Sequence, residues 1–110
     1  MIDWKRVAYL RDEIGADGFA EVADMLLEEA DQVVQQLAQG LAADAVEGQL
    51  HFLKGSALNL GLSDLAAICQ DGERRAAAGQ GAGVDLDRVV TVYGQSRAAL
   101  MDGLARTHAA

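Results

Sequence analysis

Residues 17–40 read "DGFAEVADMLLEEADQVVQQLAQG" and carry the clearest periodic pattern of the chain. Apolar residues recur there at the spacing of one face of a helix, until Gly40. Glycine is common directly after a helix, so Gly40 is a suitable end. The stretch therefore predicts an amphipathic helix, whose buried face is formed by Phe19, Val22, Ala23, Leu26, Leu27, Ala30, Val33, Val34 and Leu37.

A shorter periodic segment precedes this helix. Asp3 can cap it, because an aspartate side chain accepts hydrogen bonds from the first backbone N–H groups of a helix, and Gly15 can end it. We expect this short helix to be a lid that packs on one end of the bundle rather than one of its main helices. Its inward stripe is expected to be Trp4, Val7, Leu10 and Ile14.

Three more helical segments follow residue 40. The first ends at Gly61, Ser63 can cap the second, and Asp85 can begin the third, which we expect to fray into the final "RTHAA". The sequence "GQGAG" at 79–83 is expected to be a loop. The inward residues should be Val46, Leu50, Leu53, Ala57 and Leu60, then Leu65, Cys69, Gly72 and Ala76, then Leu86, Val89, Tyr93, Leu100 and Leu104.

The composition favours helix throughout. Proline is absent, and good helix formers fill the periodic segments of this 110-residue chain. Because the connections are short, neighbouring helices should run antiparallel. The sequence therefore predicts an all-α fold, an antiparallel up-down-up-down four-helix bundle with a short extra N-terminal helix, in a single domain over residues 1–110.

Charge and composition exclude several kinds of function. The formal charge of −8 repels nucleic-acid backbones, so we expect a protein partner. No apolar run approaches the roughly 20 residues of a membrane span, and the N-terminus is unlike a signal peptide, which indicates a cytoplasmic protein. A lone cysteine, Cys69, and two well-separated histidines offer no recognisable metal-ligand spacing. We expect a monomer that binds neither metal nor cofactor.

The stretch "HFLKGSALNLG", residues 51–61, contains the most informative side chains. At about 100° per residue, His51 lies about 140° from the centre of the buried stripe of its helix, and therefore faces water. Gly48 and Gly55 lie about 160° and 180° away, one turn on either side of the ring, and Lys54 lies on the shoulder at about 80°. Two glycines thus flank an exposed histidine.

These glycines indicate a functional histidine. Each costs a helix roughly 0.5–1 kcal/mol relative to alanine, with no packing gain visible in the sequence. Small residues there clear the ring of His51 for another protein's backbone, and Lys54 could reach an anion placed on the ring. Each of these residues taken alone is better explained as an ordinary surface residue. Their spacing relative to one another favours an accessible nucleophile that receives an anionic group.

The segment from His51 to Glu73, "HFLKGSALNLGLSDLAAICQDGE", resembles the core motif of histidine-containing phosphotransfer (HPt) domains. The resemblance implies that His51 accepts a phosphoryl group from an aspartyl phosphate on a receiver domain and passes it on. It also implies that Lys54 sits by the phosphoryl oxygens and that Gly55 keeps the ring accessible. Ser56 and Asn59 are interpreted as structural hydrogen-bonding residues.

Several relatives have a glutamine at the position of Glu73, hydrogen-bonded to the ring nitrogen that does not react. A carboxylate there could accept the ring N–H and fix the tautomer, although it would also repel an incoming phosphate. A basic residue of some relatives aligns with Ala77, so we expect Lys54 to be the cation nearest the phosphate. The expected partner surface includes Gly48 and Leu58.

The resemblance implies response-regulator receiver domains, and a hybrid or other histidine kinase, as partners. The receiver would bring the aspartate and Mg²⁺. The chain has no glycine-rich phosphate loop, so we expect no kinase activity of its own. One alternative is a non-catalytic adaptor that binds a receiver or kinase without being phosphorylated, and another is a structural bundle that self-associates.

We expect no catalytic or binding role for the remaining candidate residues. Cys69 is expected to be a small buried apolar residue, because it lies on an apolar stripe. Arg74 and Arg75 are expected on a solvated face, and no role is expected for His108.

Overall fold

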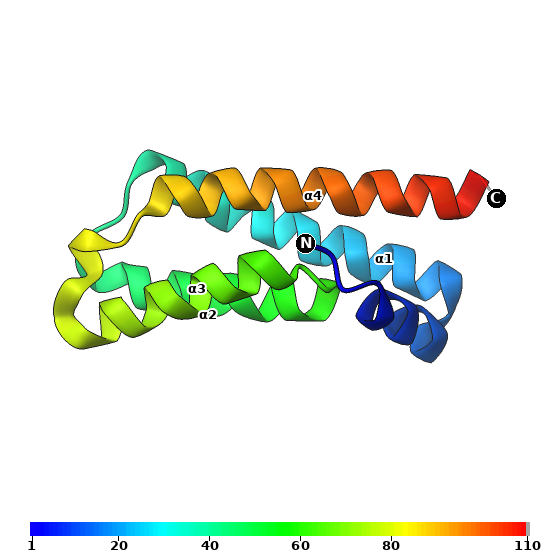
Figure 1. Cartoon of the computed structure of the whole chain (residues 1–110), viewed down its shortest axis with the longest axis horizontal. Coiled ribbons are helices and arrows are strands. Elements are labelled where there is room, and N and C mark those ends of the chain that lie inside the picture. The colour runs from blue at the N-terminus through cyan, green and yellow to red at the C-terminus, as the bar shows by residue number, and fades with distance from the viewer. Residues whose placement is uncertain (110) are drawn as a thin grey trace.

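The computed structural model describes residues 1–109, and the side chains of residues 1–106. Four α-helices make up most of the chain: α1 (Trp4–Gln39), α2 (Ala43–Leu60), α3 (Ser63–Arg75) and α4 (Leu86–Ala109). Successive helices run in opposite directions along a body of 47 × 21 × 20 Å (Figure 1). The predicted all-α, up-down-up-down four-helix bundle is confirmed. The isolated antiparallel bridge between Ile2 and Leu62 is the one β pairing within residues 1–109.

The core lies between all four helices. α1 packs against α2 and α4, and α3 packs against the same two helices, so the four form a ring around one apolar interior. Most of the predicted stripes face this interior, because helical periodicity alone decides which residues share a face. The buried apolar residues include Phe19, Ala23, Leu27, Ala30, Leu37, Val46, Leu50, Leu53, Ala57, Leu60, Leu65, Cys69, Val89, Tyr93 and Leu100.

Gly15 divides α1 into the predicted lid and the first main helix of the bundle. Its φ of 79° and ψ of 162° are not helical, so the short segment before it folds back across the bundle. Asp3 caps this segment, since its Oδ1 accepts a hydrogen bond from the backbone N–H of Arg6 at 3.2 Å. The backbone N–H of Asp3 donates to the carbonyl of Gly61 at 2.7 Å, which ties the lid to the turn between α2 and α3.

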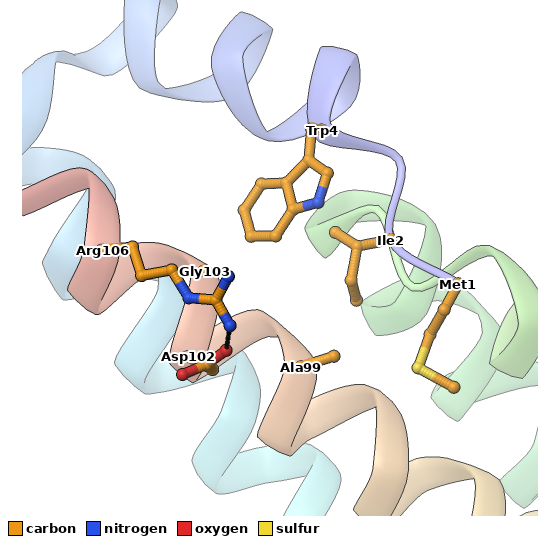
Figure 2. Close-up of a pocket in the computed structure, with 7 residues that line it drawn as sticks. All are labelled: Met1, Ile2, Trp4, Ala99, Asp102, Gly103 and Arg106. Carbon is orange, nitrogen blue, oxygen red and sulfur yellow. Dashed lines mark hydrogen bonds and ion pairs between the residues drawn. The ribbon is translucent and has the colours of Figure 1, made fainter.

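One expectation for the lid is wrong. Trp4 and Ile14, predicted to face inward, remain 42% and 40% exposed, whereas Val7 is buried. The indole of Trp4 lies over Gly103 of α4, beside Ile2 (Figure 2). The lid therefore covers only the end of the bundle, and the outer edges of its stripe stay in water.

The ends of α3 and α4 differ from prediction in three places. Ser63 is the first residue of α3 and does not cap it, because the N-cap position is occupied by Leu62, which has no side-chain oxygen to accept a hydrogen bond. The backbone N–H of Ser63 is engaged by the carbonyls of Met1 and Gly61. The expected loop over 79–83 is wound into a π-helical turn (Ala76–Gln80) and a 3-10 turn (Gly81–Gly83). The backbone of α4 stays helical to Ala109 instead of fraying, since its last residues include no helix breaker after Gly103.

A polar cluster joins α1 to α4. Asp31 accepts hydrogen bonds from the Tyr93 hydroxyl and, through both carboxylate oxygens, from the Arg97 guanidinium at 3.1 and 3.2 Å. Burial, then the hydrogen bond to Asp31, raises the pKa of Tyr93, and the same carboxylate raises the pKa of Arg97. Such paired, directional contacts fix the register of two helices. Within residues 1–109, no helix has the length and apolar character that crossing a membrane requires.

Candidate functional site

His51 lies near the middle of α2 with its side chain 74% exposed, as the helix geometry predicts. Leu50 and Leu53 on either side of it are fully buried and anchor α2 in the core. A Cβ added at Gly48 or Gly55 would meet nothing within 4 Å. Packing therefore requires neither glycine, and their effect is to leave the surface on both sides of the imidazole bare.

Glu73 of α3 reaches across to this ring. Its Oε1 lies 2.8 Å from Nδ1 of His51, and its side chain is only 15% exposed. A carboxylate can only accept a hydrogen bond, so a neutral imidazole paired with it carries its proton on Nδ1. This assignment follows from the hydrogen-bond partner, and it leaves the lone pair of Nε2 unprotonated.

Lys54 completes the group from one turn further along α2. Its Nζ donates to the other carboxylate oxygen of Glu73, Oε2, at 2.8 Å, and its side chain is 19% exposed. The structure therefore brings His51, Lys54 and Glu73 together. The ammonium of Lys54 contacts the Glu73 carboxylate, whereas the sequence resemblance implied a position beside the phosphoryl oxygens. The positive and negative charges offset each other, which reduces the repulsion that Glu73 alone would exert on an anion.

The two contacts also decide the ionisation of Glu73. Partial burial acts to raise the pKa of this carboxyl, but the hydrogen bonds from Lys54 and His51 outweigh it and lower the pKa below its ordinary value. Glu73 is consequently ionised at neutral pH. It can hold the Nδ1–H tautomer of the ring throughout the physiological range.

Two exposed apolar residues of α2 lie near His51 in the sequence, and only one of them, Leu58, was predicted as part of the partner surface. Leu58, two turns after His51, is more than half exposed, and Phe52, the residue after His51, is about half exposed. Phe52 also lines a shallow groove between α1 and α2 together with Gly48. Helix arithmetic puts Phe52 about 120° from the buried stripe, and this apolar residue on a solvent face was the available signal.

The other predicted residues contribute no chemistry here. Asn59 accepts hydrogen bonds from the Arg6 side chain through its carbonyl and side-chain oxygens, so it joins the lid to α2. Cys69 is fully buried, and burial raises the pKa of its thiol to about 12, which makes it inert.

Arg74 and Arg75 are exposed, and Arg75 pairs with Asp71. The side chain of His108 lies outside the described residues. Among residues 1–106, no three histidine, cysteine or carboxylate side chains gather as metal ligands.

Comparison with models of protein families matches residues 21–107 to the Hpt domain. No curated protein and no solved structure gives a significant match to the chain. Hpt domains interact with receiver domains and histidine kinases. Because the matched region covers most of the chain and contains the whole of α2 and α3, this protein belongs to the Hpt domain family, whose members act in phosphotransfer of two-component signalling.

Proposed function

We propose that this protein carries a phosphoryl group on Nε2 of His51 within a phosphorelay. It accepts the group from the aspartyl phosphate of a receiver domain and passes it to, or back to, a receiver domain. The observation that carries the proposal is the 2.8 Å contact between Nδ1 of His51 and Glu73, which leaves Nε2 as an exposed nucleophile. The role is that of a phosphorelay intermediate, without kinase activity of its own.

In the transfer step, the lone pair of Nε2 attacks phosphorus and forms the N–P bond. The P–O bond to the partner's aspartate breaks, and the carboxylate leaves with the electron pair. The ring proton stays on Nδ1, where the carboxylate of Glu73 offsets the positive charge that the imidazole gains. No separate base is needed, because a neutral imidazole has no proton to lose from the attacking nitrogen.

Lys54 serves the phosphorylated state. In the absence of phosphate its ammonium is held by Glu73, one helical turn from the ring. An added phosphoryl group brings several anionic oxygens to Nε2, and a flexible ammonium can turn toward them while remaining near the carboxylate. Lys54 thereby stabilises the phosphohistidine, as phosphoryl transfer depends mainly on alignment and charge neutralisation.

The partner supplies the remaining chemistry. The receiver domain brings the aspartate and Mg²⁺, and this chain binds no cofactor. Its docking surface comprises Gly48, Phe52, Gly55 and Leu58 around His51, where small residues allow close approach and apolar side chains provide buried area. A hybrid or other histidine kinase feeds the relay, and the chain acts as a cytoplasmic monomer, a single domain over residues 1–110.

The test is phosphoryl transfer in solution. A receiver domain phosphorylated on its aspartate and freed of the small donor is mixed with the protein and Mg²⁺, and the label is followed. We expect label on the protein that is lost in acid and stable in base, as a phosphorus–nitrogen bond is. His51→Gln should abolish it with the helical circular dichroism spectrum unchanged. The matched control is His108→Gln, which should be labelled as the parent protein is.

Two results would overturn the proposal. Full labelling of His51→Gln would move the modification to another side chain, and label that survives acid would move it to a hydroxyl group. Binding of the receiver with no transfer of label would instead favour a non-catalytic adaptor that uses the same surface.

A further inference from the structure

Gly72 of α3 faces Leu50 of α2. It is buried, and a Cβ built on it would lie 2.5 Å from Cδ1 of Leu50 in α2 and 3.2 Å from Cγ1 of Val84. Carbon atoms in contact normally stay about 3.5–4.0 Å apart, so the first of these distances leaves no space for a side chain. A side chain at residue 72 therefore requires that either the δ-methyl group of Leu50 or α3 itself moves.

This close approach is directly beside the functional site. Leu50 precedes His51 in α2, and Gly72 precedes Glu73 in α3. The helix spacing at the Leu50–Gly72 contact thus determines how far the Glu73 carboxylate has to reach. Both of its contacts are 2.8 Å long, and a hydrogen bond weakens once its donor and acceptor separate beyond about 3.2 Å. An outward shift of Glu73 by about half an ångström would stretch both contacts past that limit.

We propose that Gly72 is a positioning residue for phosphotransfer: its missing side chain sets the spacing of α2 and α3 at which Glu73 reaches the imidazole of His51. The claim rests on the proposed function of His51, but the geometry it concerns exists before any transfer. Leu50 is fully buried, and a packed core offers its δ-methyl group little space to move into, so in this proposal a side chain at residue 72 pushes α3 outward and carries Glu73 with it.

The test reads the tautomer of the His51 ring by nitrogen NMR shifts, in the full chain and without a partner. The parent protein should show mainly the Nδ1–H form, and Glu73→Ala gives the ratio without the carboxylate. Gly72→Ala should shift the ratio toward that of Glu73→Ala, by up to about tenfold, the value of one charge-assisted hydrogen bond. The transfer rate should fall by no more than it does in Glu73→Ala.

Two double variants separate positioning from simple destabilisation. Leu50→Val removes the δ-methyl group that a new Cβ would strike, so Gly72→Ala with Leu50→Val should restore the parent tautomer ratio. Val84→Ala relieves only the contact with a residue outside α2, so Gly72→Ala with Val84→Ala should fold but keep the altered ratio. This pair remains informative even if Gly72→Ala alone does not fold. Leu50→Val alone should leave the ratio unchanged.

The proposal fails if Gly72→Ala keeps the parent ratio, or if relief at Val84 restores the ratio and relief at Leu50 does not. In either case the glycine serves packing alone. Absence of transfer in the parent protein would overturn the function of His51 but would leave the tautomer measurement valid, so the two failures can be told apart.

Discussion

Nζ of Lys54 donates to Oε2 of Glu73 at 2.8 Å, on the side of the carboxylate opposite the atom that contacts His51. One carboxylate therefore holds both the ring and the cation nearest to it. The arrangement orients the imidazole without leaving a net negative charge in front of an incoming phosphoryl group.

The first prediction concerns stability against pH. The folded-state pKa of Glu73 is depressed, so its contacts stabilise the fold at pH values above the ordinary carboxyl pKa of 4.5 and are lost as pH falls below 4.5 toward the folded-state pKa. Glu73→Gln should therefore lower the free energy of unfolding by about 1 kcal/mol at pH 7. The difference between the two proteins should shrink at pH 3, as measured by urea unfolding.

Asp71→Asn is the control, because Asp71 is an exposed carboxylate on the same helix that pairs with Arg75. It should change stability by a few tenths of a kcal/mol at most, since exposed ion pairs contribute little. If Glu73→Gln lowers the free energy of unfolding equally at both pH values, the charge of the Glu73 carboxylate does not contribute to stability.

The second prediction concerns Lys54. Lys54→Met keeps the aliphatic length and removes the ammonium, so transfer to His51 should slow by about tenfold without being abolished, the value of one charge-assisted contact to a largely solvated phosphate. The rate of label appearance on the protein measures it. Lys5→Met, at an exposed lysine of the lid, should transfer at the parent rate. Complete loss of transfer in Lys54→Met would mean that the lysine does more than neutralise charge.

The third prediction concerns access to the ring. Since a Cβ at Gly55 meets nothing within 4 Å, Gly55→Ala should raise the free energy of unfolding by roughly 0.5–1 kcal/mol. Gly55→Gln should fold normally but block receiver docking, because the longer side chain covers the surface one turn from His51. Binding of a receiver domain by isothermal titration calorimetry measures the second effect.

Gly94 provides the matched control, since it is an exposed glycine within α4 with equally open space around it. Gly94→Gln should fold and bind the receiver as the parent protein does. Equal binding by Gly55→Gln and Gly94→Gln would show that the glycine beside the histidine has no role in docking.

The sequence predicted those parts of the fold that depend on local periodicity. The stripe of α2 and the exposure of His51 follow from a turn of 100° per residue, which needs no knowledge of neighbouring helices. The capping role expected for Ser63 was wrong, since α3 begins at Ser63 itself, and the backbone N–H of Ser63 bonds the carbonyl of a distant residue, Met1. Long-range contacts of this kind leave no periodic signal.

The site was predictable to a similar degree. His51, Lys54 and Gly55 lie on one helix, so their spacing along the sequence fixed their relative positions. Whether Glu73 reaches the ring depends instead on the distance between α2 and α3. That distance is set by Gly72 against Leu50, a pairing that no single helical pattern contains. The predicted stripe of α3 includes Gly72 as an inward residue, but helical periodicity contains no information on what its missing side chain permits.

The last prediction uses Trp4, the one tryptophan of the chain, as a reporter of the lid. Its indole packs directly over Gly103 of α4, so the methyl group of Gly103→Ala would strike the ring (Figure 2). The lid remains tied to the turn after α2 through Asp3 and Gly61, so we expect the indole to swing outward while the bundle stays folded. Fluorescence emission should shift to longer wavelength, and the free energy of unfolding should fall by about 1–3 kcal/mol, the usual cost of overpacking. Transfer to His51 should proceed at the parent rate, since α4 does not pack against α2. An unchanged emission maximum together with a gain in stability, as the higher helix propensity of alanine alone would give, would show that Trp4 is not held against α4 in solution.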